Sequence, residues 1–285
     1  SAPDAAGTFL AADVGGTHVR AARVRASGDA AHPVEILEYR KYRCAEYPSL
    51  ESILADFCQS GPGVRHCVIA SAGYPLADGT VITANLPWPL SPSRIRAQLE
   101  LDGVDLVNDF EALAHAASQV DASGVLHLTG PQQAPRGPTL VLGPGTGLGA
   151  AVWIPVGKGA VVLATEAGQA ALAAQRDLEM QIVREMLKHR PYVCVERVLS
   201  GPGLLNLYQA LCALRGEEAR LATPDAITAA ALAGNDAMAS RCLDVFCGVL
   251  GSVVGDMAVL YGIKGGIHLA GGILPKIGTW LQHST

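Results

Sequence analysis

Residues 139–154 read TLVLGPGTGLGAAVWI, an apolar run, a glycine-rich turn and a second apolar run. The two apolar runs predict β-strands, and Gly143–Gly149 predicts the turn that joins them. Residues 8–24 repeat this order around a second turn, Asp13–His18, which reads DVGGTH. A strand, a glycine turn and a strand therefore open both halves of the chain. This repetition predicts two similar α/β domains that each present one glycine turn to a shared cleft.

Other segments extend the α/β pattern on both sides of these turns. Ser91 followed by Pro92 is typical of a helix start, with Ser91 as the N-cap and Pro92 at the first helical position. Strands are predicted at Val64–Ala70 and Val104–Val107, with a buried strand at Ile267–Ala270. Helices are predicted at Ser91–Leu99, Phe110–Ala117, Leu178–Lys188, Gly203–Leu214, Thr223–Ala233 and Ala237 to about Leu260.

Composition excludes several classes of protein. Hydrophobic residues make up 49% of the 285 residues and charged residues 16%, which indicates a folded core rather than a disordered chain. The net charge of -5, without a basic run, predicts no nucleic-acid partner. The longest uncharged stretch, Gly137–Gly157, is broken by glycine and proline, so we expect no membrane span. Seven cysteines without a C-x-x-C pair or a secretory leader predict reduced thiols in the cytoplasm.

The glycine turns have the composition of phosphate-binding loops. Glycine lets backbone amides converge on a phosphate, and in the first turn Asp13 and Thr17 add a carboxylate for hydrated Mg²⁺ and a hydroxyl. A plain hairpin explains the same residues. The second turn lacks the Gly-Lys-Ser/Thr ending of a P-loop and does not fit G-x-G-x-x-G. Gly271–Gly272, after the last strand, either lies against a nucleotide base or ends that strand.

Carboxylates and amides near predicted turns offer partners for the hydroxyl groups of a polyol. Asn108 and Asp109 follow a strand, where Asp109 is either the N-cap of the next helix or a general base. Glu166, Gln169 and Glu196 are either solvated surface side chains or sugar ligands. The histidines and cysteines show no zinc spacing, and the serine-hydrolase motif G-x-S-x-G is absent.

Taken together, these motifs resemble the bacterial glucokinases of the actin-like sugar-kinase superfamily. The first turn matches that family's first phosphate motif except that His18 stands where the family usually has asparagine, and the second turn matches almost verbatim. The other matching segments are Thr83–Trp88, Asn108–Phe110 and Glu196–Gly203, and the motifs keep the family order from Leu10 to about Pro275.

The resemblance implies a two-domain actin-like ATPase (ribonuclease H-like) fold, with a smaller domain at 8–109 and a larger one at 110–285. It implies transfer of phosphate from Mg²⁺-ATP to the 6-hydroxyl of D-glucose, with Asp109 as general base, in a cytoplasmic homodimer. The implied ATP ligands are Asp13, which faces Mg²⁺ through water, Gly15, Gly16, Thr17, Gly145, Thr146, Gly147, Gly271 and Gly272. The implied sugar ligands are Asn85, Asn108, Asp109, Glu166, Gln169 and Glu196.

Two departures from the family pattern bear on function. The family usually reads Glu-Gly-Gly-His where this chain has Glu166-Ala167-Gly168-Gln169. A glutamine still donates to a hydroxyl but is never charged, and the methyl group of Ala167 changes the φ expected of that loop. These changes predict a kinase with weaker or less selective sugar binding. Family members also continue beyond Pro275, so the end at Thr285 means either an unobserved part or altered domain closure.

Two other functions fit parts of the pattern. A sugar-binding regulator with weak or no turnover shares the fold, although the helix-turn-helix and Cys-rich zinc motif of the repressor-type relatives are not found in this sequence. An actin-like ATPase or chaperone also shares the fold, but the paired sugar-side motifs argue against it.

Overall fold

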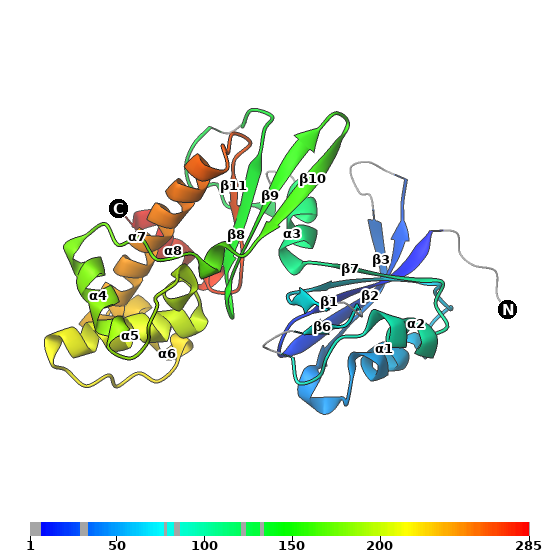
Figure 1. Ribbon diagram of the computed structural model, residues 1–285, viewed down its shortest axis with the longest axis horizontal. Coiled ribbons are helices and arrows are strands. Elements are labelled where there is room, and N and C mark those ends of the chain that lie inside the picture. The colour runs from blue at the N-terminus through cyan, green and yellow to red at the C-terminus, as the bar shows by residue number, and fades with distance from the viewer. Residues whose placement is uncertain are drawn as a thin grey trace. The chain divides into compact units, whose positions relative to one another are not determined.

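The computed structural model of the chain describes residues 7–28, 34–76, 79–82, 86–120, 124–131 and 134–284. The chain divides into two compact units, Ser1–Ala112 and Leu113–Thr285, which are called unit 1 and unit 2. Figure 1 shows the elements of both units, each of which combines helices with a β-sheet. The fold is therefore of the α/β class, as the sequence predicts.

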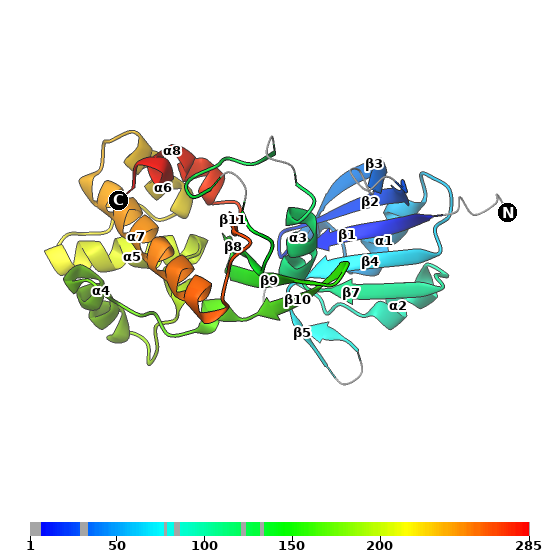
Figure 2. The same cartoon turned by 90° about the horizontal axis from the view of Figure 1, so that it is seen from above.

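Unit 1 is built on a five-stranded sheet with the order β3-β2-β1-β4-β7, whose strands lie side by side in Figure 2. Strands β1, β4 and β7 are parallel, and β2 and β3 are antiparallel additions to β1. The elements are β1 Thr8–Val14, β2 His18–Ala26, β3 Val34–Arg43, η1 Cys44–Glu46, α1 Leu50–Cys58, β4 His66–Ser71, β5 Tyr74–Pro75, β6 Val81–Ile82, α2 Pro92–Gln98, β7 Gly103–Val107 and α3 Asp109–Ala117, which runs past the boundary of the unit.

The parallel pairing in unit 1 determines where its candidate functional residues lie. Val14 of β1 pairs with Ser71 of β4, and Ala70 of β4 pairs with Val107 of β7. Because the carboxyl ends of parallel strands share one edge of a sheet, the turn after β1 and the start of α3 after β7 lie at the same edge. A core of fully buried side chains that includes Leu10, Ile53, Phe57, Ile69 and Ile95 holds α1 and α2 against the sheet.

Unit 2 combines a four-stranded sheet of order β10-β9-β8-β11 with a group of packed helices. Strand β11 is parallel to β8, whereas β9 and β10 are antiparallel to their neighbours. The elements are β8 Thr139–Pro144, β9 Leu148–Val156, β10 Gly159–Thr165, η3 Ala167–Gln169, α4 Asp177–Leu187, η4 Val195–Arg197, α5 Gly201–Arg215, α6 Pro224–Leu232, α7 Ala237–Leu260, β11 Ile267–Leu269, η5 Leu274–Ile277 and α8 Gly278–His283.

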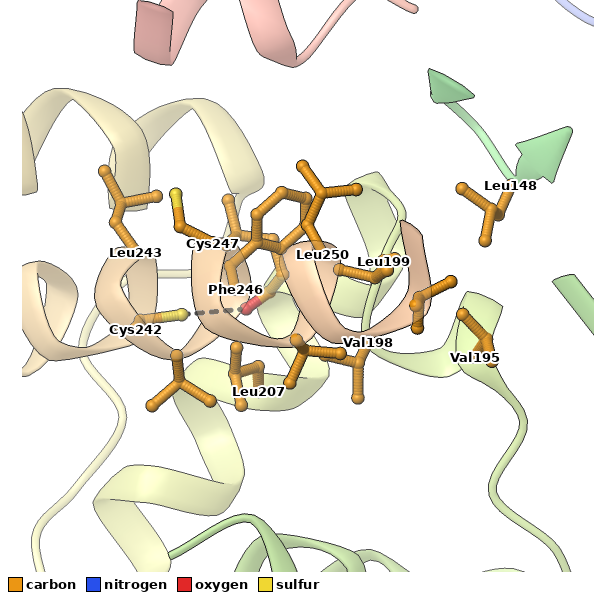
Figure 3. Close-up of a cluster of buried hydrophobic side chains, with 14 of the residues drawn as sticks. Leu148, Val195, Val198, Leu199, Leu207, Cys242, Leu243, Phe246, Cys247 and Leu250 are labelled. Atoms are coloured by element: carbon orange, nitrogen blue, oxygen red, sulfur yellow. Dashed lines mark hydrogen bonds between the residues drawn. The ribbon is translucent and has the colours of Figure 1, made fainter. Parts of the chain in front are cut away.

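The 24-residue helix α7 forms the centre of the unit 2 core. Figure 3 shows Phe246 and Leu250 of α7 among buried side chains of α5 and η4, with Leu148 at the start of β9 in the same cluster. By length and composition, α7 is the one helix in the described ranges that is able to cross a membrane. Its fully buried Leu243 and Phe246 give it the character of a core helix, which passes the same test.

The sequence predicted the main elements of both units. Both strand–turn–strand openings are confirmed as β1–β2 and β8–β9, and helix α2 starts at Pro92 with the Ser91 side chain accepting from the Arg94 amide. The prediction that Ile267–Ala270 is buried is wrong. Ile267 is 37% exposed because β11 is an edge strand with β8 on one side only. No element was predicted at β3, α1 or β10.

Candidate active site

The first glycine turn, in unit 1, is held by contacts to its carbonyl groups. The Gly15 amide donates to the His18 carbonyl at 3.0 Å. Cys44 of η1 donates twice, from its amide to the Thr17 carbonyl at 3.0 Å and from its thiol to the Gly15 carbonyl at 3.3 Å. The amides of Gly16 and Thr17 have no acceptor within the described ranges. This turn therefore keeps two backbone donors free for an anion.

His18, which stands where the family usually has asparagine, is an uncharged group at neutral pH. Partial burial, followed by the positive charges of Lys41 and Arg43, lowers the pKa of His18 below its usual value of 6.5. A neutral imidazole both donates and accepts a hydrogen bond, as an amide side chain does. The substitution thus preserves the charge of the first turn.

The carboxylate of Asp13 lies at the end of β1 beside the first turn. It pairs with Arg20 of β2 at 2.7 Å, and both side chains are about half exposed, at 50% and 47%. The two residues are cross-strand partners in the β1–β2 ladder. Since an exposed pair of this kind contributes at most about 1 kcal/mol, Arg20 leaves the carboxylate available to a stronger partner.

Asn108 and Asp109 have different positions at the start of α3. The Asn108 side-chain oxygen accepts from the Phe110 amide at 2.9 Å and from the Glu111 amide at 3.2 Å, so Asn108 is the capping residue. Asp109 is the first residue of the helix, and its Oδ1 accepts from the same Phe110 amide at 2.9 Å. The cap role that the sequence left open for Asp109 therefore belongs to its neighbour.

The carboxyl group of Asp109 is more basic than an ordinary aspartate. Burial is the largest cause that raises its pKa above 3.8, and the negative charge of Asp13 raises the pKa further, while the Phe110 amide opposes both. A basic carboxylate with one oxygen outside the helix cap is suited to accept a proton from an alcohol.

The second glycine turn, in unit 2, is held by steric fit and by α5. The Gly145 amide donates to the Gly147 carbonyl at 2.7 Å, and the Gly145 carbonyl accepts from the Gly201 amide at the start of α5 at 2.8 Å. A Cβ atom on Gly147 would overlap the carboxylate of Glu196. The Leu148 amide donates to Glu196 Oε2 at 2.8 Å. Thr146 is exposed at the tip of the turn.

Gly271 brings the third glycine site against the second turn. The Ala270 amide donates to the Leu142 carbonyl at 2.8 Å, which continues the parallel pairing of β11 with β8. Gly271 has a φ of +89°, and a Cβ atom there would overlap the carbonyl of Pro144. Gly272, by contrast, has open space around it. Unit 2 therefore brings together the predicted nucleotide residues of the second turn and of Gly271–Gly272.

The predicted sugar ligands of unit 2 lie on or directly beside η3 and η4, next to the second turn. Gln169 Nε2 donates to Glu196 Oε1 at 3.2 Å, so Glu196 is a hydrogen-bonded side chain rather than a solvated surface charge. Glu166 is exposed, and its carbonyl accepts from the Gln169 amide at 2.9 Å. Ala167 has a negative φ, as Glu100 is the only non-glycine residue with positive φ in the described ranges. Ala167 therefore carries no backbone strain, and the change of φ expected relative to the family stays a prediction.

Asn85, together with Thr83 and Ala84, lies outside the described residues. The described part of this loop resumes at Leu86, and the Trp88 indole N–H donates to the Tyr47 carbonyl at 3.3 Å. The role predicted for Asn85 stays a prediction.

A magnesium ion fits the donor groups near the first turn. No group of three or more His, Cys, Asp or Glu side chains gathers at one point in the described part of the chain. Asp13 and Asp109 nevertheless interact electrostatically. Mg²⁺ in phosphoryl-transfer sites is held by one or two carboxylates, with water and substrate phosphates completing its shell. The carboxylate of Asp13, with Asp109 nearby, fits that mode of binding but not an ion caged by protein alone.

Comparison with known proteins identifies the family. The family model described as Glucokinase matches residues 10–285. The chain belongs to the glucokinase family. It is 58% identical over 270 residues to a glucokinase-like protein of Xylella fastidiosa strain 9a5c. This match covers 95% of this chain and 81% of that protein. It is 34% identical over 278 residues to a glucokinase of Saccharophagus degradans, covering 97% of this chain and 86% of that enzyme.

Solved structures of glucokinases share the fold. The crystal structure of a glucokinase from an Antarctic psychrotroph has a TM-score of 0.84 at 33% identity, and the match covers 97% of this chain and 86% of that one. A ROK-family glucokinase of Streptomyces griseus, crystallised with glucose and AMPPNP, has a TM-score of 0.60 at 22% identity, covering 98% and 91%. The protein is thus a sugar kinase by family, and so a transferase that binds ATP and a sugar. Its fold is the actin-like ATPase fold.

Several residues at the glucokinase motifs were missed by sequence reasoning. Cys44 anchors the first turn, Arg20 pairs with Asp13, and the thiol of Cys194 contacts Gln169. Of these, only Arg20 was predictable from the sequence, because the pairing of a β-hairpin places a residue of the second strand directly opposite Asp13. The two cysteines act through contacts between segments that are distant in sequence, which no local pattern reports.

A cavity of about 920 Å³ in unit 2 lies away from the glucokinase motifs. It is lined by the C-terminal half of α5, from Tyr208 to Arg215, and by the start of α7. The N-terminal end of α5 contacts Gly145. A helix of 15 residues spans about 20 Å, so the cavity and the second turn are at opposite ends of α5.

Proposed function

We propose that this protein is a glucokinase that transfers the γ-phosphoryl group of Mg²⁺-ATP to the 6-hydroxyl of D-glucose. The observation that carries the proposal is the state of Asp109, a carboxylate made more basic by burial and by Asp13 and left with one oxygen outside the helix cap. Family membership supplies the reaction class, and Asp109 supplies a group able to perform its proton transfer.

Asp109 is proposed as the general base of the reaction. Its free oxygen accepts the proton of the 6-hydroxyl while the hydroxyl oxygen forms a bond to the γ-phosphorus. The bond between that phosphorus and the bridging oxygen breaks, and ADP leaves. Since phosphoryl transfer has a loose transition state, the base mainly orients the alcohol and removes its proton late. A general base of this kind contributes about 10²- to 10⁴-fold in rate.

The glycine sites are proposed to bind ATP. Gly16 and Thr17 offer the free amides of the first turn, and Gly15 lies beside them as a third proposed ATP ligand. Gly145, Thr146 and Gly147 form the second turn. Gly271 and Gly272, packed on the second turn, are proposed to contact the adenosine. Asp13 is proposed to hold Mg²⁺ through water, and the ion supplies neutralisation of the charge on the phosphates. In this scheme the protein positions phosphates with backbone donors rather than with lysine.

The polar side chains that face a sugar come from both units in this proposal. Asn108 keeps its side-chain N–H₂ after its oxygen caps α3, so it is proposed to donate to a hydroxyl. Glu166, Gln169 and Glu196 offer acceptors and one further amide. The role of Asn85 is carried from the family motif alone. A structure of a glucokinase from Balamuthia mandrillaris with glucose, at a TM-score of 0.79 and 20% identity, shares the fold.

The test is glucose-dependent formation of ADP by the purified protein, with Asp109→Asn as the decisive variant. Asparagine keeps the shape of the side chain and its carbonyl acceptor for the Phe110 amide, but it does not accept the proton. We expect kcat to fall by about 10²- to 10⁴-fold. Asp105→Asn is the matched control, because Asp105 is an exposed aspartate of the same unit on β7. Its kcat is expected to stay within about twofold of wild type.

The outcome also separates the proposed kinase from a regulator of the same fold. Equal activity of the Asp109→Asn variant and wild type would overturn the assignment of the base. Binding of glucose in calorimetry without any ADP formation would favour a sugar-binding regulator. The similarity to a ROK-family transcriptional regulator, with a TM-score of 0.64 at 18% identity, concerns the fold alone. A cytoplasmic homodimer is proposed from family resemblance, and sedimentation of the purified protein tests the dimer.

A further inference from the structure

The segments η3 and η4 are held together by backbone hydrogen bonds. The Val195 amide donates to the Ala170 carbonyl at 2.9 Å, and the Leu172 amide donates to the Val193 carbonyl at 3.1 Å. Ala171 and Cys194 form an antiparallel bridge between these two bonds. This pairing fixes the backbone beside Gln169 against the backbone that carries Cys194 and Glu196, although about 25 residues separate them.

The side-chain amide of Gln169 has a defined orientation. Its Nε2 lies 3.2 Å from Glu196 Oε1, and its Oε1 lies 3.7 Å from the thiol sulfur of Cys194. A carboxylate only accepts hydrogen bonds, so the nitrogen of the amide must face Glu196. The oxygen then faces the thiol, which donates. The flipped amide would place two acceptors together and leave the thiol without an acceptor.

Glu196 extends this group of contacts to the second glycine turn. Its Oε2 accepts from the Leu148 amide at 2.8 Å, and its carbonyl accepts from the Ser200 hydroxyl at 2.7 Å. Gly147 leaves no room for a side chain beside the carboxylate. The contacts therefore run from the thiol of Cys194 through Gln169 and Glu196 to the backbone of the turn.

Cys194 is suited to hold this arrangement because it is buried. Its side chain is 3% exposed, whereas Gln169 is exposed. A buried donor gives a more lasting contact than an exposed one, because water does not compete for the acceptor. Tyr192 adds a second restraint, since its hydroxyl donates to the Gln169 carbonyl at 2.8 Å. Gln169 is thus held at its backbone and at both ends of its amide.

We infer that Cys194 is a positioning residue that acts through Gln169 and Glu196 to set the selectivity of this kinase among hexose epimers. The inference rests on the proposed function, in which Gln169 and Glu196 face the sugar. With the thiol in place, Gln169 offers a sugar one N–H and one lone pair in fixed directions. Without it, the amide keeps only its contact with Glu196. Its oxygen is then less firmly oriented, so it distinguishes less well between an axial and an equatorial hydroxyl.

The experiment compares Cys194→Ala with Cys194→Ser. Alanine removes the donor, and we expect KM for glucose to rise about three- to tenfold while kcat stays within about twofold. The ratio of kcat/KM for glucose over mannose and over galactose should fall by a similar factor for at least one of the two epimers. Serine keeps a donor and should restore KM and selectivity to within about twofold of wild type. Cys247→Ala, a buried cysteine of α7, is the matched control and should change neither.

A double-variant test covers the case in which Cys194→Ala does not fold. Gln169→Met keeps the length of an exposed side chain but removes both amide contacts. Cys194→Val removes the donor but fills the buried site. If Cys194 acts through Gln169, this variant raises KM in the wild-type background and changes KM no further when added to Gln169→Met. Additive losses would overturn the inference, as would an unchanged KM in Cys194→Ala or a serine variant that behaves like alanine.

Binding measurements separate this inference from the proposed function. Calorimetry with glucose, mannose and galactose gives the dissociation constants without turnover. If wild type binds glucose but forms no ADP, only the proposed function fails, and the same ratios of dissociation constants test Cys194. If turnover is normal and the epimer ratios are the same in wild type and Cys194→Ala, only the inference about Cys194 fails.

Discussion

The two glycine turns have similar sequences and opposite ways of keeping their shape. In the first, a Cβ atom on Gly15 would meet only the His18 carbonyl, at an ordinary 3.5 Å. That turn is anchored from outside by Cys44. In the second, Gly147 has no room for a Cβ atom, and Gly271, which follows β11, packs closely against the Pro144 carbonyl. In the first turn glycine leaves open space in which a ligand can approach the backbone. In the second turn it allows neighbouring segments to pack closely.

This difference indicates where each turn tolerates change. The first turn depends on polar contacts to its carbonyls, so loss of one donor weakens it. The second depends on the absence of side-chain atoms, so the addition of a methyl group damages it. Three substitutions, taken from the largest expected effect to the smallest, test this contrast, and a fourth concerns the carboxylates beside the first turn.

The largest effect is expected for Gly271→Ala. The φ of +89° disfavours an L-residue, and the added Cβ would overlap the Pro144 carbonyl, a backbone atom with little freedom to move. We expect the free energy of unfolding to fall by about 3 kcal/mol, measured by urea denaturation. Gly272→Ala is the control, because open space surrounds Gly272 and its effect should stay within about 0.5 kcal/mol. Equal losses in the two variants would contradict the packing role of Gly271.

A smaller loss is expected for Gly147→Ala. The overlap here is with the end of the Glu196 side chain, which moves more easily than backbone. Its displacement breaks the contact with the Leu148 amide, so we expect a loss of about 2 kcal/mol in unfolding free energy. Displacement of Glu196 should also raise KM for the sugar. Gly145→Ala, in the same turn with nothing within 4 Å, should show no stability loss beyond about 0.5 kcal/mol.

The first turn is tested by Cys44→Ala. This removes the thiol that donates to the Gly15 carbonyl but keeps the amide that donates to Thr17. Loss of one hydrogen bond predicts a drop of about 1 kcal/mol in unfolding free energy, together with a higher KM for ATP. Cys44→Ser should recover most of both, since it retains a donor. If Gly15→Ala proved more harmful than Cys44→Ala, the contrast between the turns would be reversed.

Much of the fold was readable from the sequence because it depends on local patterns. Apolar runs separated by glycine gave β1–β2 and β8–β9, and Ser91 with Pro92 gave the start of α2. The strand β3 was not predicted, because it is an edge strand whose residues are mostly exposed and show no simple alternation. Local patterns report propensity, whereas an edge strand is determined by its neighbour.

The candidate site was predictable in its residues but not in its contacts. Asp109 and Glu196 were found from motifs, but their surroundings depend on segments far away in the sequence. The sequence left open whether Asp109 or another group caps α3, and only the structure assigns that role to Asn108. The contact of Cys194 with Gln169 arises from the backbone pairing of Ala171 with Cys194, which no spacing rule contains.

The smallest effect concerns the carboxylates beside the first turn and is a change of stability with pH. The pKa of Asp109 is raised in the folded protein by burial and by Asp13, so the folded state holds this proton more tightly than the unfolded chain does. The contribution of Asp109 to the free energy of unfolding is therefore complete below pH 3.8, about the pKa of this group in the unfolded chain. It is lost as pH rises through the higher pKa of the folded state. Asparagine at this position does not titrate, so the variant does not lose unfolding free energy in this way.

The unfolding free energy of Asp109→Asn minus that of wild type should therefore increase as pH rises from 4 towards 7 and then become constant. Urea denaturation at several pH values measures it. The matched variant Asp105→Asn, at an exposed position of β7, is the control for loss of a carboxylate outside the first-turn region. If the difference between Asp109→Asn and wild type did not change with pH, then ionisation of Asp109 would not lower the stability of the folded protein. Because the same variant is expected to lose activity, a gain in stability at neutral pH would show that the first-turn region is built for proton transfer rather than for stability.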